Sequence, residues 1–230
     1  MQVDKGRLAH VDIVVIKNAL ADVNVERWSL PTPSAFTVKE LDTLEDWVRE
    51  GGGLILVVDH MPVAGAGRDL LSRFGVTISN GFAAKSERLD GYEPSDVMKA
   101  TNLRFCRDDS LDGLINSHPI NDEELGSPIN LVLTSGGSAF RLPEHGEPLL
   151  TFGPGTTSLV PEVSWEFDDD TPRIDVNGWV QAGVVRIGHG RVAVLGDSQP
   201  LTVPAYFDGP PTADNVDFTL NLFRWISARP

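Results

Sequence analysis

The sequence predicts an α/β fold built on a mainly parallel β-sheet with helices on both faces, and three observations support this prediction. Gly51–Pro62 starts with glycines that end a helix and continues into the apolar run Leu54–Val58. Such a run is typical of a strand buried on both faces of a parallel sheet. A similar run spans Val11–Ile16, and a helical pattern lies between the two runs. Together these segments predict a right-handed strand–helix–strand unit.

The helix of this unit has a clear beginning and end. Thr37-x-x-Glu40 is a capping box, in which each side chain satisfies a free backbone amide of the other residue. The apolar stripe that follows comprises Val38, Leu41, Leu44 and Val48, with Trp47 beside it. Gly51 and Gly52 end the helix. Residues 21–36 contain Pro31 and Pro33, so we expect them to form a loop across the carboxyl edge of the sheet.

The second half of the chain predicts a hairpin and a closing helix. Trp179–Ile187 and Arg191–Leu195 flank a glycine-bearing turn, which is typical of a β-hairpin. A short helix is also expected at Asp69–Phe74, and a proline-rich loop at Pro200–Pro211. Asp214 caps the expected last helix, whose inward face would comprise Val216, Leu220 and Phe223.

Composition narrows the class of protein. The chain has 230 residues, of which 41% are hydrophobic and 23% charged, and residues 1–230 are interpreted as one α/β domain. A net charge of −14 disfavours nucleic acid and anionic membranes as partners. One cysteine excludes an intrachain disulfide framework and a Cys-rich zinc site. No apolar run is long enough to span a bilayer and no signal peptide is evident, so a cytoplasmic location is expected.

Several motifs together resemble a class I glutamine amidotransferase-like domain, most of all bacterial proteins of the DUF4350 type. They are the strand ends Val58-Asp59-His60 and Leu195-Gly196-Asp197, the helix entry Phe36-Thr37-x-x-Glu40, the exit Trp47-Val48-x-x-Gly51-Gly52 and the closing Phe218-x-x-Asn221-x-x-x-Trp225. The resemblance covers residues 8–82 and 178–227. It implies a flavodoxin-like three-layer sandwich, with the hairpin as an extension. Glutaminase activity is not expected, because no glycines surround Cys106 to form a nucleophile turn.

The resemblance also implies a missing unit at the start of the chain. Relatives of this type carry an additional strand and helix before the segment that matches Val11. Here about ten residues precede that segment, which would leave one edge of the sheet unpaired. A second copy of the chain could cover this edge, so we expect a homodimer.

Candidate site residues lie at the predicted strand ends. Asn18, Asp59, His60, Asp197 and Ser198 each follow an apolar strand, and His118 could join them from a loop. The carboxyl ends of parallel strands form the usual ligand crevice of such folds. His60 suits proton transfer near neutral pH, with Ser198 or an activated water as nucleophile. Polar strand ends also cap helices and tie loops, and His60 could simply anchor the loop at Pro62.

The expected function is therefore a small hydrolase acting on an ester or related small molecule. His60, Asp59, Asp197, Ser198 and His118 form the catalytic candidates, and Asn18, Trp28 and Trp179 the substrate-binding candidates. Trp165 could also line a sugar or aromatic ligand. No cofactor is expected, although Asp59, His60, His118 and Asp197 could together hold a divalent metal. The alternative is a non-catalytic ligand-binding or protein-interaction domain on the same scaffold.

Overall fold

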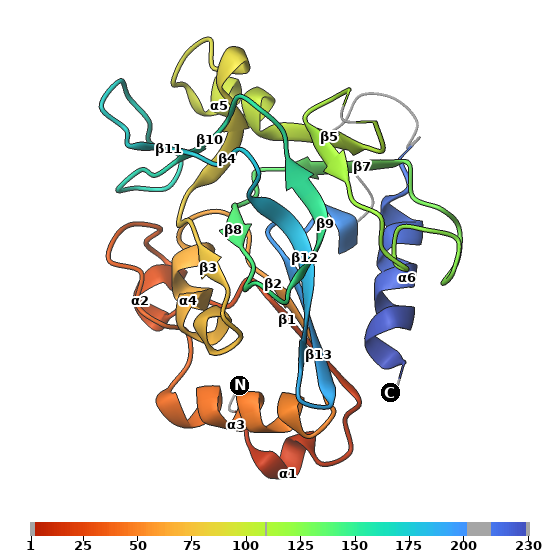
Figure 1. The fold of residues 1–230 in the computed structure, drawn as a ribbon. Helices are drawn as coiled ribbons and strands as arrows, with labels where there is room; N and C mark the ends of the chain where they lie inside the picture. Colours follow the sequence, from red (N-terminus) through yellow and green to blue (C-terminus); the bar gives the residue numbers. More distant parts are fainter. Residues whose placement is uncertain (1–2, 109, 202–212, 229–230) are drawn as a thin grey trace.

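A computed structural model describes residues 3–108, 110–201 and 213–228. Its centre is a ten-stranded mixed sheet (Figure 1). The main path of this sheet runs β1 (Ile13–Lys17), β2 (Gly53–Val57), β13 (Gly190–Leu195), β12 (Val180–Ile187), β9 (Glu147–Phe152), β6 (Gly113–Ile115), β5 (Asn102–Cys106) and β7 (Leu131–Ser135). β8 (Phe140–Arg141) pairs with β12 and with β3 (Thr77–Ile78). A separate three-stranded sheet comprises β11 (Arg173–Asp175), β10 (Thr156–Leu159) and β4 (Phe82–Lys85).

The expectation of a flavodoxin-like, mainly parallel sandwich is wrong. Only the pairs β1–β2, β2–β13 and β5–β6 are parallel, and the remaining pairs of the sheet are antiparallel. The β12–β13 hairpin is the reason. It lies in the middle of the sheet, where β13 runs parallel to β2 and β12 runs antiparallel to β9. The hairpin therefore reverses the strand direction at the sheet centre, and the sheet curls away from a flat sandwich (Figure 1).

The first unit has the predicted strand–helix–strand form. Helix α3 (Val38–Arg49) begins at Thr37 with both halves of the capping box formed, and Glu40 Oε2 accepts the Thr37 backbone amide at 3.0 Å. Gly51 follows the helix with a φ of 122°, a conformation that favours glycine. Helix α4 (Val63–Arg73) is longer than the predicted segment Asp69–Phe74, because Ala64–Gly67 form its first turns.

The remaining helices are short, apart from the last one. They are α1 (Lys5–Leu8), α2 (Asp22–Val25), α5 (Pro94–Thr101), the 3₁₀ turns η1 (Ser86–Arg88) and η2 (Gln199–Leu201), and α6 (Asn215–Ser227). None of the helices in the described ranges could cross a membrane, since none is sufficiently long and apolar. The expected loop Pro200–Pro211 lies mostly outside the described residues.

Helices cover both faces of the parallel part of the sheet. Leu54 and Leu56 of β2 pack under α3 and α4, while Ile55 and Val57 pack under α6. Both faces of β2 are thus buried, as the apolar run predicted.

The predicted inward face of α6 is wrong at two of its three positions, since Phe223 packs against the core but Val216 and Leu220 do not. Phe218, Leu222 and Trp225 face the core, whereas Val216 is 56% exposed and Leu220 is 46% exposed. The predicted cap is also different, because the Asp214 carboxylate accepts the Asn130 amide at 2.7 Å and makes no capping bond to α6.

Candidate functional site at the carboxyl ends of β1, β2 and β13

Three parallel strands end side by side at one edge of the sheet. Val57 of β2 is in register with Lys17 of β1 on one side and with Leu195 of β13 on the other. The residues just beyond these positions therefore meet at the same edge. We call this group the strand-end cluster, and it comprises Asn18, Asp59, His60, Asp197 and Ser198.

Asp59 ties the three strand ends together. Its Oδ2 accepts hydrogen bonds from Asn18 Nδ2 at 2.7 Å and from Ser198 Oγ at 3.0 Å. Its backbone amide donates to Asn18 Oδ1 at 3.3 Å. The other carboxylate oxygen, Oδ1, is buried and has no hydrogen-bond partner among the described residues. Asn18, Asp59 and Ser198 are all half-buried, so the cluster is only partly closed to solvent.

Asp197 lies beneath this edge and is 2% exposed. Its two carboxyl oxygens accept backbone amides, from Ser135 at 2.8 Å and from Gln199 at 2.7 Å. Burial raises the pKa of Asp197 well above its ordinary value, and the nearby charge of Asp59 raises it further, while the two amide bonds act in the opposite direction. The net effect favours the protonated form, in which Asp197 holds two loops without a buried charge.

His60 is fixed in one tautomer by the backbone of the next residue. Its Nδ1 lies 2.6 Å from the carbonyl oxygen of Met61, so Nδ1 carries the proton and Nε2 is left as an acceptor. Burial lowers the pKa of His60, although the Met61 carbonyl and the Asp59 charge oppose the shift. The imidazole is therefore neutral at physiological pH.

Aromatic rings surround the His60 imidazole. It stacks on Phe82 with ring centroids 4.2 Å apart, meets the edge of Trp165 at 5.0 Å and lies 5.7 Å from Trp28. Trp28 is 41% exposed. Trp165 has a φ of 68°, a left-handed conformation that is unusual for a non-glycine residue. Apolar ring surface thus adjoins the polar side chains of the cluster.

The turn between β7 and β8 closes the cluster from the far side, and sequence reasoning missed it. Asp59 forms an isolated bridge with Gly137. A Cβ atom on Gly137 would lie 2.5 Å from the Gly196 carbonyl oxygen and 2.8 Å from the Asp197 Cβ, so only glycine fits. The sequence signal is the glycine pair of Ser135-Gly136-Gly137-Ser138, but nothing local relates it to Asp59. Phe82 was missed for the same reason.

His118 and Trp179 lie away from the cluster. His118 packs against Trp225 of α6 with ring centroids 5.7 Å apart, and its Nε2 lies 3.5 Å from Glu147. The Arg141 guanidinium carbon lies 4.3 Å from the centroid of the Trp179 ring. Trp179 also lines a separate pocket of about 440 Å³. The four-residue metal set is therefore not assembled. Within the described parts of the chain, no three His, Cys, Asp or Glu side chains lie close enough to hold a metal ion.

The geometry does not assemble a serine–histidine pair. Ser198 Oγ donates to Asp59, and His60 Nδ1 donates to a backbone carbonyl. A serine nucleophile needs an adjacent base to accept its proton, and the hydrogen bond of Ser198 leads to a carboxylate instead. The hydrolase assignment suggested by the sequence consequently has no support here.

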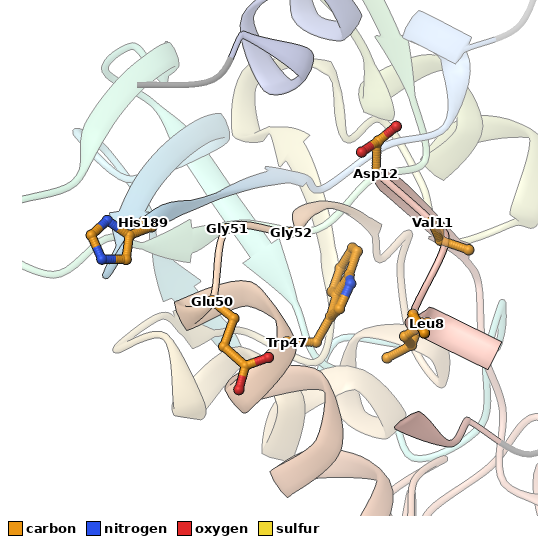
Figure 2. Close-up of a pocket in the computed structure, with 9 residues that line it drawn as sticks. Leu8, Val11, Asp12, Trp47, Glu50, Gly51, Gly52 and His189 are labelled. Atoms are coloured by element: carbon orange, nitrogen blue, oxygen red, sulfur yellow. The ribbon is translucent and has the colours of Figure 1, made fainter. Parts of the chain in front are cut away.

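A different pocket, of about 540 Å³, lies at the opposite edge of the sheet, where β2 begins (Figure 2). It is lined by Leu8, Ala9, Val11, Asp12, Trp47, Glu50, Gly51, Gly52 and His189. The Trp47 ring lies directly against the backbone of Gly52, where a Cβ atom would be 2.4 Å from it. The pocket contains no residue of the strand-end cluster, so the two are separate surfaces on opposite ends of β2.

Comparison with known proteins shows that this chain is similar in fold to several solved structures. No protein-family model matches the chain, and no curated protein matches it. The N-terminal domain of mmIFT52 is similar with a TM-score of 0.62 and 13% identity, over 99% of this chain and 82% of that one. The cytoplasmic protein STM1381 of Salmonella typhimurium LT2 is similar with a TM-score of 0.51 and 12% identity, over 94% and 71%. A protein of Bacteroides uniformis ATCC 8492 described as ThuA-like has a TM-score of 0.47 and 11% identity, over 96% and 71%.

The resemblance to glutamine amidotransferase-like domains is therefore wrong. Neither the N-terminal domain of mmIFT52 nor STM1381 is described as an amidotransferase or a hydrolase. The motifs behind the resemblance were a capping box, glycines after a helix and polar residues at strand ends. Each of these has a local physical cause that applies to any strand–helix–strand unit, so together they do not identify a family.

Proposed function

We propose that this protein is a non-catalytic ligand-binding domain that holds a small polyhydroxylated molecule, such as a sugar, at the strand-end cluster. The observation that carries the proposal is the arrangement around Asp59. A half-buried carboxylate, an amide and a hydroxyl meet where three strands end, and the ring of the adjacent His60 lies 5.7 Å from the exposed Trp28 ring. Binding sites for small molecules combine apolar and aromatic walls with a few converging polar groups in this way.

The hydrogen-bonding chemistry of the cluster suits hydroxyl groups. His60 Nε2 and Asp59 act as acceptors, while Asn18 and Ser198 can both donate and accept. A hydroxyl group both donates and accepts, so it can bond to either kind of side chain. A carbonyl or phosphate ligand offers only acceptors, and the charge of Asp59 would repel an anion.

Trp28 supplies the apolar side of the proposed site. The C–H face of a sugar ring is apolar and can pack on an indole, while its hydroxyl groups reach sideways to polar side chains. Binding of this kind needs no Ser198–His60 pair, because no covalent bond of the ligand is broken. We also propose a cytoplasmic location, which the description of STM1381 as a cytoplasmic protein and the single cysteine support.

Isothermal titration calorimetry with a panel of neutral monosaccharides and disaccharides tests the proposal. We expect at least one member to bind, and Asp59→Asn to weaken it about tenfold or more, because hydrogen bonds to a charged group are the stronger ones. Trp179→Phe is the matched control, since Trp179 lies outside the cluster, and it should leave affinity unchanged. Equal losses in both variants, or no binding by any sugar, would refute the assignment.

A further inference from the structure

A second surface lies on the segment that follows β1. Four of the ten exposed large apolar side chains among the described residues fall between positions 23 and 30. Val23 is 57% exposed, Val25 is 60%, Trp28 is 41% and Leu30 is 46%. Single exposed apolar residues are ordinary, whereas four within one short segment form a patch of the kind that binds a partner.

The apolar segment is held rigidly by one buried side chain. Asn24 is 1% exposed, and its Nδ2 donates to the carbonyl oxygens of Arg27, Ser29 and Pro31 at 3.2, 2.9 and 3.3 Å. This amide fixes the backbone while the flanking valines point outward. A rigid apolar surface loses little conformational entropy when a partner binds, so it is well suited to recognition.

The same segment is joined to an acidic one. Leu30 donates its backbone amide to the Glu162 carbonyl at 2.8 Å, and Ser164 donates to the Trp28 carbonyl at 2.8 Å. Ser29 and Val163 form the isolated bridge between these two bonds. Residues 23–33 and 161–172 therefore form one continuous surface, which we call the apolar–acidic surface.

Two pockets flank the junction, and Glu162 lines both of them. One, of about 540 Å³, is lined by Leu30, Pro31, Thr32, Pro33, Arg68 and Glu162. The other, of about 560 Å³, is lined by Pro161, Glu162, Val163, Glu166, Phe167, Asp168, Asp170, Thr171 and Pro172. The four carboxylates of the second pocket are exposed, and none forms an ion pair with another described residue. Asp168 Oδ1 already accepts hydrogen bonds from Asp170 and Thr171 in its own loop, whereas the carboxylates of Glu162 and Glu166 can pair with charges on a partner.

We propose that the apolar–acidic surface docks a peptide segment of a partner protein that carries bulky apolar residues beside Lys or Arg. Leu30 and Val25 would receive the apolar side chains, and Glu162 and Glu166 the basic ones. Charge complementarity selects this occupant, because unpaired carboxylates next to an apolar patch favour a basic segment and repel an acidic one. The same surface of a second copy fits poorly here, because pairing the two would bring their exposed carboxylates together.

Fluorescence anisotropy tests this with a fluorescein-labelled peptide of repeating Leu-Lys-Ser units. Two matched peptides carry Ser in place of every Leu, or Glu in place of every Lys. We expect the first peptide to bind in the micromolar range and both matched peptides to bind at least about tenfold more weakly. High salt should remove most of the contribution of the lysines, because exposed charges are screened at roughly 1 M ionic strength.

Variants of the protein separate this surface from general attraction to an acidic protein. Val25→Ser with Leu30→Ser should weaken peptide binding about tenfold, and Glu162→Gln with Glu166→Gln should weaken it severalfold at low salt. Matched controls change equally exposed residues elsewhere: Val216→Ser with Leu220→Ser, and Glu123→Gln with Glu124→Gln. Both controls should stay within about twofold of the wild type.

Equal losses in the test and control variants would overturn the proposal, and so would an absence of binding by the Leu-Lys-Ser peptide. All substituted side chains are exposed, so we expect circular dichroism melts to match the wild type. None of them is Trp28 or a member of the strand-end cluster. Sugar binding should consequently be unchanged in these variants, and failure of one proposal leaves the other standing.

Discussion

Replacing Asp197 by Asn perturbs the most deeply buried carboxyl group of the strand-end cluster. Asp197 is 2% exposed, and its two oxygens accept the Ser135 and Gln199 amides at 2.8 and 2.7 Å. Asn keeps the size and one acceptor, but its NH₂ group then faces one of the two backbone N–H groups. A buried N–H left without an acceptor costs about 1–3 kcal/mol. We expect the free energy of unfolding to fall by about this amount near pH 4.

The difference in unfolding free energy between the wild type and the Asp197→Asn variant should change with pH in one direction. Burial and the Asp59 charge raise the pKa of Asp197 in the folded state. A raised folded-state pKa gives stability that is fully present below the unfolded value of about 3.9 and is lost as pH rises through the folded value. Wild-type stability should therefore fall with rising pH by up to about 1.4 kcal/mol per pH unit in that interval. The Asn variant has no titrating group at this position, so the difference in unfolding free energy between the two proteins should become smaller as pH rises.

Urea unfolding followed by circular dichroism, at intervals between about pH 4 and 8, measures this difference. Other titrating groups are common to both proteins and largely cancel in the comparison. A difference that widens as pH rises would refute the reasoning. It would mean that Asp197 is ionised in the folded protein, with its charge stabilised by the two amide groups.

Three further variants test other parts of the structure. Gly137→Ala should lower the unfolding free energy by about 1–3 kcal/mol and shift the melting temperature accordingly, because the new methyl group meets the Gly196 carbonyl at 2.5 Å; an unchanged melt would contradict this close contact. Burial lowers the pKa of His118, so the stability that the neutral imidazole contributes is present above about pH 6.5 and is lost as pH falls through the lower folded-state pKa. His118→Asn should therefore reduce the loss of unfolding free energy at acid pH, measured by urea unfolding. The same acid slope in the variant and the wild type would contradict this role of His118. The homodimer stays a prediction, and its basis is that β1 is an edge strand on which Val15 is 45% exposed. Val15→Lys should give a smaller mass in sedimentation than the wild type. A wild type that is monomeric at all concentrations would exclude the dimer.

Local signals in the sequence predicted the first part of the fold well. The capping box at Thr37 and Glu40 and the two-sided burial of β2 depend on residues close in sequence, and both are present. The hairpin β12–β13 was also predicted, but its position was not. Whether a hairpin lies at the edge or the centre of a sheet depends on its long-range partners, here β2 and β9, which no local pattern specifies. That one placement turns an expected parallel sandwich into a curled mixed sheet.

The candidate site, like the fold, could be predicted only where local sequence patterns determine the structure. Asn18, Asp59 and Ser198 could be grouped because each follows a strand, and strand ends of parallel neighbours meet. His118 and Trp179 could not be placed, since they lie just outside β6 and β12, whose pairing the sequence did not reveal. Phe82, Trp165 and Gly137 reach the cluster through contacts between segments far apart in the chain. The orientation of α6 was missed because Val216 and Leu220 mimic a buried stripe while facing outward.

The most direct measurement of the proposed site is the ¹⁵N resonance pair of the His60 imidazole, followed by NMR during titration with the sugar that binds best. The structure assigns the proton to Nδ1 and leaves Nε2 as an acceptor. We predict a neutral Nδ1–H ring at pH 7 whose Nε2 resonance moves on ligand binding, while the ring of the distant His118 is unaffected. A ring protonated on Nε2, or an Nε2 resonance that stays fixed as the ligand saturates, would contradict binding at the strand-end cluster.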